Sequence, residues 1–241
     1  MEEHRRRYYL DKIGIQTWVT RTASPESPSA GLTGEDVPLH AEHDEPVDTA
    51  PVKDFRGSLD ELRNEVASCT LCALHQGRTQ TVFGTGSPDA DWLIVGEAPG
   101  FEEDRKGEPF VGRAGQLLTK MLRAIGLERD EVFIANILKC RPPDNRDPQP
   151  GEIEHCIPYL AQQIGLIQPK IILAMGRIAA QTLLDSPSAL GRLRGTEHHY
   201  ADTGIPVVAT YHPAYLLRSP QQKRSAWEDL QFAVRVRESS S

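Results

Sequence analysis

The sequence predicts an α/β fold: a three-layer α/β/α arrangement around a central, mostly parallel four-stranded sheet. Two observations lead to this prediction. Four short, strongly apolar segments recur between residues 92 and 211, and helix-like patterns separate them. Such alternation is typical of βαβ units, in which helices cover both faces of a parallel sheet. Because ligands of these sheets bind beyond the carboxyl ends of the strands, polar residues at those ends are the first candidates for a functional site.

The expected strands are rich in β-branched residues and apolar throughout, which is the pattern of strands buried on both faces. They span residues 92–96, 132–137, 170–175 and 206–211.

The expected helices show apolar residues at helical spacing or a starting signal. Ser58 with Glu61 three residues later has the pattern of a capping box before the first helix. Pro150 and Gly176 precede two others. The expected helices span residues 59–68, 114–125, 152–166, 177–184 and 221–237.

Composition divides the chain into three parts. The 241 residues are 39% hydrophobic and 25% charged, which excludes collagen-like, coiled-coil and fully disordered proteins. Residues 22–54 carry eight Asp or Glu, one Lys and five Pro, so we expect an acidic, proline-rich disordered linker. Residues 1–21 form an N-terminal extension with a helix-then-strand pattern and are a candidate contact for a protein partner. Residues 55–241 are long enough to form one domain with one core.

Targeting signals are not apparent in the sequence. No apolar run approaches the roughly 18 residues of a membrane span, and the N-terminus lacks the apolar stretch of a secretory signal. We therefore expect a cytoplasmic, monomeric protein without membrane contact. The net charge of −7 resides in the acidic segment, so the domain shows no global basic signature for nucleic acid.

The four cysteines form one close pair, Cys69 and Cys72, and one wider pair, Cys140 and Cys156. A two-residue spacing is poor disulfide geometry, and disulfides are rare in cytoplasmic proteins. Four thiolates with one tight pair are typical of a zinc site or an iron–sulfur cluster, and spacing alone does not choose between them. Four unrelated buried thiols are the alternative.

Several long motifs follow in order along the domain. They are GEAPGFEEDRKGEPFVGRAGQLL at 96–118, NILKCRPPDNRDPQPGEIEHCIPYL at 136–160, GRIAAQTLL at 176–184 and TYHPAYLLRSP at 210–220. Through these motifs the chain resembles the uracil-DNA glycosylase superfamily, and within it family 4, the iron–sulfur-containing branch. The resemblance implies an enzyme that releases uracil from single- or double-stranded DNA and so begins base-excision repair. It also implies a [4Fe-4S] cluster, rather than zinc, on Cys69, Cys72, Cys140 and Cys156.

The resemblance assigns the substrate-binding residues to two motifs. Ala98 and Gly100 lie in the first motif, together with Phe110, which matches the aromatic residue that stacks on the flipped base. Asn136 matches the asparagine that reads uracil. A fixed amide can accept from the N3–H of uracil and donate to O4, whereas cytosine presents the reverse pattern.

The catalytic residues implied by the resemblance are His212, Glu97 and Glu103. His212 matches the donor to uracil O2, which stabilises negative charge on the departing base. Ala98 stands where family 1 has an acidic residue, so Glu97 and Glu103 are implicated in water activation instead. Asp104 is a further nearby carboxylate, and the sequence does not decide which carboxylate acts on water.

DNA contacts are expected beyond His212 and near the strand ends. Leu216 and Leu217 could fill the space left by the flipped base, and at least one of the two is expected to pack inward. The candidates for phosphate contacts are Arg218, Arg113, Lys139 and Arg141.

Two rival functions remain. A uracil-DNA-binding or cross-linking relative carries a basic, histidine-containing insertion after the second strand, whereas CRPPDNRDPQP here is short and has no His. A metal-stabilised nucleic-acid-binding module without catalysis would be colourless and would release no base.

Overall fold

One six-stranded sheet forms the centre of residues 57–239, the part of the chain that the computed structural model describes. The strand order is β1-β3-β2-β4-β6-β5. Neighbours among β2, β3, β4 and β6 are parallel, and β1 and β5 pair antiparallel at the two edges. The strands are β1 (Thr85–Gly86), β2 (Trp92–Gly96), β3 (Phe133–Asn136), β4 (Ile171–Met175), β5 (His198–Tyr200) and β6 (Ile205–Thr210).

The α/β/α prediction is confirmed, but its sheet of four strands is corrected to six. The four predicted strands form the parallel centre. The two additional strands are two and three residues long. Neither edge strand is apolar, so neither gives the signal of a buried strand.

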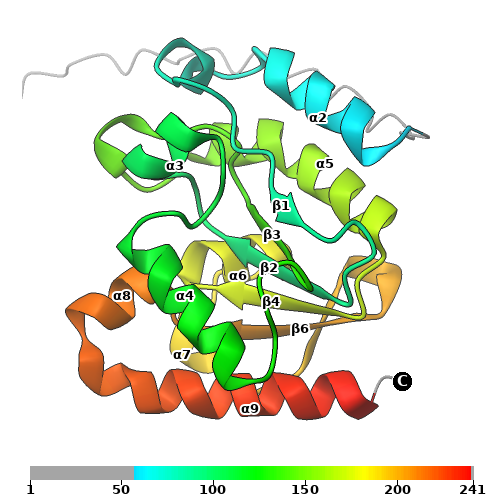
Figure 1. The fold of residues 1–241 in the computed structure, drawn as a ribbon, viewed down its shortest axis with the longest axis vertical. Helices are drawn as coiled ribbons and strands as arrows, with labels where there is room; N and C mark the ends of the chain where they lie inside the picture. The colour runs from blue at the N-terminus through cyan, green and yellow to red at the C-terminus, as the bar shows by residue number, and fades with distance from the viewer. Residues whose placement is uncertain (1–56, 240–241) are drawn as a thin grey trace, which may run out of the picture. The chain divides into compact units, whose positions relative to one another are not determined.

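Helices cover both faces of the sheet (Figure 1). Apolar side chains of α4, α8 and α9 pack on one face, and those of α2, α5 and α6 pack on the other. The helices are α2 (Leu59–Ser68), α3 (Phe101–Lys106), α4 (Arg113–Ala124), α5 (Pro150–Ile167), α6 (Arg177–Leu183), α7 (Leu190–Leu193), α8 (Pro213–Arg218) and α9 (Lys223–Ser239). Short 3₁₀ helices are η1 (Ala73–Gln76), η2 (Pro143–Asn145), η3 (Ala201–Thr203) and η4 (Pro220–Gln222).

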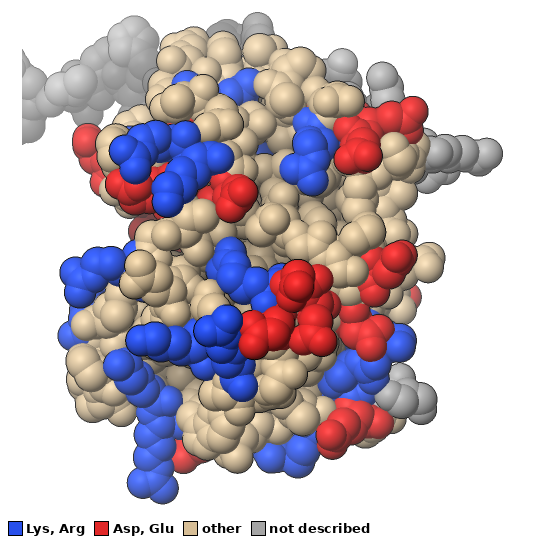
Figure 2. Space-filling model, in the orientation of Figure 1, with Lys and Arg blue, Asp and Glu red and all other residues tan. Residues whose placement is uncertain are grey.

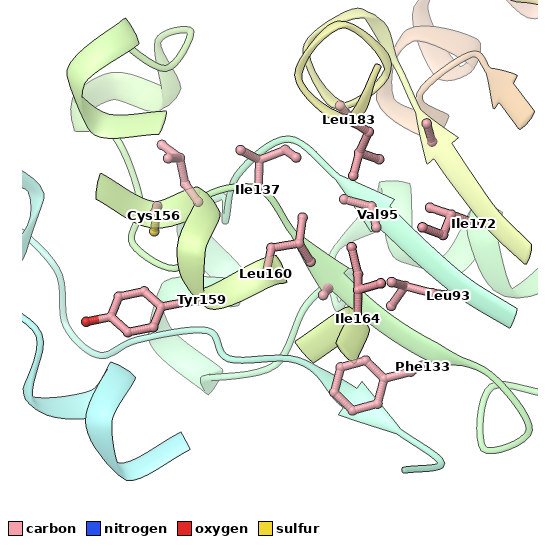
Figure 3. Packing of buried hydrophobic residues seen from close by; sticks show 14 of the residues in the cluster. Leu93, Val95, Phe133, Ile137, Cys156, Tyr159, Leu160, Ile164, Ile172 and Leu183 are labelled. Atoms are coloured by element: carbon pink, nitrogen blue, oxygen red, sulfur yellow. The ribbon is translucent and has the colours of Figure 1, made fainter. Parts of the chain in front are cut away.

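The core consists of two layers because successive residues of each central strand point to opposite faces. In β2, Leu93 and Val95 join the layer under α5, whereas Trp92 and Ile94 join the layer under α4 and α9. Figure 3 shows the first layer, in which Leu160 of α5 packs toward the strands. All residues of β2, β3 and β4 are buried, so the rigid centre of the sheet supports the loops at its carboxyl end.

The predicted capping box at the start of α2 is present. The Ser58 hydroxyl accepts a hydrogen bond from Glu61 N at 3.3 Å, and the Glu61 carboxylate accepts one from Ser58 N at 2.7 Å. The predicted extension 1–21 and linker 22–54 lie outside the described residues. Among residues 57–239, no helix has the length and apolar character needed to cross a membrane.

Candidate active site and candidate metal centre

A cleft with a volume of 460 Å³ lies at the carboxyl ends of the parallel strands. The segment after β2, the last residue of β3 and the segment after β6 all contribute to its walls. It brings together eight residues that the sequence predicts for the site: Glu97, Ala98, Gly100, Glu103, Phe110, Asn136, His212 and Arg218. The other lining residues are Pro99, Ala114, Pro142, Asn145, Arg146, Asp147, Ala214 and Tyr215.

Phe110 is held in the cleft in a left-handed backbone conformation, with φ of 55°. Such a conformation is strained for a bulky residue and persists only where the surroundings impose it. On one side, Pro109 O accepts from Arg129 Nη2 at 2.9 Å. On the other side, a Cβ at Gly115 of α4 would lie 1.6 Å from Phe110 O, so only glycine permits this approach.

Asn136 and Phe110 meet above the end of β2 because Gly96 has no side chain. A Cβ at Gly96 would lie 2.4 Å from Asn136 Oδ1 and 2.6 Å from the Phe110 ring. Asn136 is buried, and its backbone carbonyl accepts from Lys139 Nζ at 2.8 Å. The backbone of Asn136 is thus anchored, and its side-chain amide lies at the cleft wall beside the Phe110 ring.

His212 is positioned beside Phe110, with ring centroids 5.4 Å apart. Its Nδ1 accepts from Ala214 N at 3.1 Å at the start of α8, so the neutral ring carries its proton on Nε2. Burial, assisted by the Arg218 guanidinium, lowers the pKa of His212 to about 4, and Glu103 opposes this shift. The ring is therefore a neutral donor at physiological pH.

The three candidate carboxylates have different surroundings. Glu103 Oε1 accepts from Val111 N and Gly112 N, each at 3.0 Å, and so orders the turn that precedes α4. Asp104 is buried outside the cleft lining, and both its oxygens accept from Thr79 N at 2.9 and 3.1 Å.

Glu97 lines the cleft and is half-buried. Burial raises its pKa above the ordinary value, with a further rise from Asp147 and an opposing effect of Arg177. Among the hydrogen bonds of residues 57–239, none involves the Glu97 carboxylate. Its oxygens are therefore more available to a water molecule than those of Glu103.

The loop before α5 forms a wall of the cleft that the sequence did not predict. Arg146 binds Glu152 through two nitrogens at 2.9 and 2.5 Å, and Asp147 accepts from Arg177 at 2.7 Å. Asn145 has φ of 52°, and no apolar pattern marks this loop. Its proline-rich sequence was the only signal that could have indicated an ordered turn.

Two of the candidate DNA contacts are buried in the structure. Leu216 is 1% exposed and packs into the core layer under α4 and α9, whereas its neighbour Leu217 is 37% exposed. Leu216 is therefore the leucine that packs inward, as the sequence led us to expect of one of the two. Lys139 is 1% exposed and donates to Asn136 O and, at 2.7 Å, to Gln163 Oε1. Its buried ammonium holds the chain after β3 and does not face solvent.

The four cysteines line a second, smaller cavity between α2 and α5. Cys69 and Cys72 follow α2, Cys140 follows β3, and Cys156 lies within α5. All four are free thiols. The structure thus brings together cysteines from three separate parts of the sequence.

Nitrogen donors surround the sulfur atoms of this cavity. Arg78 Nη1 lies 3.2 Å from Cys140 Sγ, and Lys139 N lies 3.2 Å from Cys156 Sγ. Burial raises the pKa of the Cys156 thiol to about 12 and also raises the pKa of Cys140 and Cys72. Thiolates at these positions would therefore require a positive partner, such as a bound metal.

The chain is similar to known proteins over most of the described domain. Residues 83–231 match the family described as "Uracil DNA glycosylase superfamily". A type-4 uracil-DNA glycosylase of Archaeoglobus fulgidus is 46% identical over 178 residues, covering 71% of this chain and 89% of the relative. That of Sulfurisphaera tokodaii is 47% identical, covering 71% and 81%, and that of Thermotoga maritima is 43% identical, covering 74% and 94%. The chain therefore belongs to the uracil-DNA glycosylase superfamily, and within it to the type-4 branch.

Proposed function

We propose that this protein hydrolyses the N-glycosidic bond of a flipped-out deoxyuridine in DNA, releasing uracil and leaving an abasic site. The observation that carries the proposal is the meeting of Phe110, Asn136 and His212 in one cleft at the sheet's carboxyl end. The similarity to type-4 uracil-DNA glycosylases supports the same activity.

Recognition is divided between two side chains. The Phe110 ring stacks on the extruded base, which supplies affinity without distinguishing one base from another. The Asn136 amide accepts from N3–H and donates to O4 of uracil. Cytosine would place an acceptor and a donor there in the opposite order, so both hydrogen bonds would be lost.

Bond cleavage places negative charge on the base. As the bond between C1′ and uracil N1 breaks, its electron pair leaves with the base and is shared with O2. His212 Nε2–H donates to O2, and the Nδ1 bond from Ala214 N supports this tautomer. A donor that is already neutral and oriented needs no proton transfer before the bond breaks.

Water completes the reaction at C1′, and Glu97 accepts the proton that the water loses. The open carboxylate of Glu97 supports this role. Glu103 acts indirectly, by holding the turn after Phe110 through Val111 N and Gly112 N.

Cys69, Cys72, Cys140 and Cys156 would hold a [4Fe-4S] cluster. Within residues 57–239, no three His, Cys, Asp or Glu side chains are grouped as ligands of a single metal ion. Four thiolate donors suit either a zinc ion or an iron–sulfur cluster, and the similarity to type-4 uracil-DNA glycosylases supports the cluster. When bound, the cluster supplies a structural link between α2, α5 and the segment after β3, and it takes no part in the cleavage step.

DNA binding is proposed to depend on local contacts around the cleft. Figure 2 shows basic and acidic side chains interleaved on one face, with basic ones predominating on the left, where α3, α4 and α8 lie. Arg218 of α8 is exposed and lines the cleft, and its neighbour Leu217 is exposed, so these two residues are the proposed contacts from that helix. The cytoplasmic location and the monomeric state stay predictions.

The test is release of free uracil from oligonucleotides that contain one deoxyuridine, in single- and double-stranded form. We expect uracil release and an alkali-labile site from both forms, and none from matched oligonucleotides with thymidine or deoxycytidine. Binding of uracil-containing DNA without release, or a covalent protein–DNA product, would instead indicate a binding or cross-linking relative.

A further inference from the structure

Phe101 is an exposed aromatic residue at the edge of the cleft. It is the first residue of α3, directly after Gly100, which lines the cleft. Phe101 is 57% exposed, and Asp104 is the only buried residue of the helix that it begins. A single exposed apolar residue is common on protein surfaces, so its surroundings decide whether it has a role.

The guanidinium group of an arginine lies over the Phe101 ring. The Arg141 guanidinium lies 5.2 Å from the centroid of the Phe101 ring. Arg141 Nε also donates to Asn145 Oδ1 at 2.8 Å, and Asn145 lines the cleft. The stacked pair is therefore tied to the cleft wall, and the exposed part of the Phe101 ring faces solvent beside the cleft.

Two successive residues of α8 also combine an apolar and a basic side chain. There, exposed Leu217 is next to Arg218, which lines the cleft. Figure 1 shows α3 and α8 on opposite sides of the carboxyl ends of the strands. On both α3 and α8, an exposed apolar side chain thus lies near a guanidinium group. This combination suits a nucleic-acid strand, in which base faces alternate with phosphates.

We propose that Phe101 and Arg141 form a stacking site for the nucleobase next to the flipped deoxyuridine. The exposed part of the Phe101 ring contacts the base, Arg141 backs the ring, and the guanidinium edge lies within reach of the adjacent phosphate. The site takes any base because every base has a flat π-face, and it favours single-stranded DNA, whose bases are free to leave their neighbours. This inference rests on the proposed function.

The test is a double-mutant cycle between Phe101 and the neighbouring base. The ligand is a single-stranded oligonucleotide with the non-hydrolysable analogue 2′-fluoro-deoxyuridine. The nucleotide on one side, then on the other, is replaced by an abasic residue. Phe101→Ala should weaken binding by about 5- to 20-fold, within the range for loss of one base–aromatic stack, when both neighbouring bases are present. With the contacting base removed, the same substitution should change the dissociation constant by less than about 2-fold.

Three variants sharpen the result. Phe101→Trp should retain the parent affinity, and Phe101→Leu should lose most of it because leucine has no flat face. Trp227→Ala removes another exposed aromatic side chain, on α9 and outside the cleft lining, and should change nothing.

If Phe101→Ala weakened binding of the oligonucleotide equally with and without each neighbouring base, the stacking site would be overturned. Binding by Phe101→Leu with the affinity of the parent protein would also overturn it. Release of uracil by the unsubstituted protein is measured in parallel. A parent protein that releases uracil but shows no coupling rejects the stacking site alone, whereas a parent that releases none rejects the proposed function.

Discussion

At the scale of single residues, the cleft separates affinity, discrimination and rate among different side chains. Phe110 offers a flat face, Asn136 a donor and an acceptor, and His212 a donor directed by Ala214 N. Because these interactions act at different stages of the reaction, substitutions should change different measured constants.

Asn136→Asp should slow uracil release, because a carboxylate cannot donate to O4. Some release of cytosine is expected only if the new acid is protonated and its hydroxyl donates instead. The measurement is the single-turnover release rate on matched uracil and cytosine oligonucleotides. Uracil release at the parent rate would show that another group reads the base.

His212→Ala should lower the single-turnover rate of uracil release by about 10²–10³-fold, the usual loss when an oxyanion donor is removed. Affinity for uracil-containing DNA should change little, since charge on O2 develops mainly in the transition state. The measurement pairs the rate at saturating enzyme with an independent binding isotherm. A loss of affinity as steep as the loss of rate would assign His212 to DNA binding instead.

The pH profile should distinguish a neutral His212 from an imidazolium. With a pKa of about 4, His212 stays neutral as pH falls from 8 to 6, so its titration should not change the single-turnover rate over that range. The rate should fall at the pH where the Glu97 carboxylate becomes protonated, which lies above the ordinary range of a glutamate because burial raises its pKa. A rate that rises as pH falls through about 6.5 would indicate catalysis by the protonated ring.

The sequence could predict which residues lie at the cleft, but not whether each side chain faces the cleft or the core. The positions of Glu97, Asn136 and His212 were predictable because these residues end or follow apolar strands. Leu216 and Leu217 are chemically identical neighbours, so only the packing of α8 decides which one is buried. Lys139 was misplaced because a buried lysine is rare and depends on partners such as Gln163 that are distant in sequence.

At the scale of helices and strands, the parallel centre was predictable because its strands are apolar on both faces. The edge strands β1 and β5 were not, since they are short and at least partly exposed. The helix ends shift by one or two residues at several places. Helix α4 starts one residue earlier than expected. The turn before it is held by the Glu103 carboxylate, which lies eight to nine residues earlier in the sequence and so gives no local signal for the helix start.

An ion pair with a buried carboxylate joins three elements close to Tyr211, the residue before His212. Arg194, after α7, binds Asp229 of α9 at 2.7 and 3.0 Å, and Thr210 at the end of β6 donates to Asp229 at 2.7 Å. The Arg194 guanidinium also lies 4.1 Å from the ring centroid of Tyr211, the residue before His212. The position of His212 therefore depends on how α9 packs against β6.

Asp229→Ala should lower the free energy of unfolding by roughly 3 kcal/mol, because the largely buried Arg194 guanidinium would lose its carboxylate partner and keep only Ser225 O and the Tyr211 ring. As a control, Glu128→Ala breaks the exposed Arg123–Glu128 pair and should cost less than about 1 kcal/mol. Thermal midpoints of the two variants and the parent provide the comparison. Equal decreases of the thermal midpoint in the two variants would show that the Arg194–Asp229 pair stabilises the fold no more than the exposed pair does.

At the scale of the whole molecule, composition identified a folded domain but not its activity. The net charge of −7 gave no hint of DNA, because the DNA-facing residues proposed here are few and local. Identification depended on the long motifs, which specify the residues around one cleft and around the cysteine cavity.

Cys69→Ala and Cys140→Ala should each lower iron content and the thermal midpoint, with little change in the preference for uracil over cytosine. The reason is that the cysteines stabilise packing between α2 and α5, away from the base-reading cleft. Iron analysis, absorbance near about 400 nm and thermal unfolding provide the measurements. Unchanged iron in either variant would contradict the proposed ligands.

The proposed ligation at the cysteine cavity also bears on how easily the N-terminal segment of the domain separates locally from the rest of the fold. The segment 57–82 precedes the first strand, and Cys69 and Cys72 are the proposed covalent anchors of this segment to the rest of the fold. Without them, its attachments are the packing of residues such as Leu62, Val66 and Leu74 and hydrogen bonds such as Val82 N to Lys139 O at 2.8 Å and Thr79 N to Asp104 Oδ1 at 2.9 Å. Segments with few attachments open locally at a lower free energy than the core. Oxidative loss of the proposed cluster should therefore appear first as faster amide hydrogen exchange and protease nicking in α2, while the sheet retains its protection.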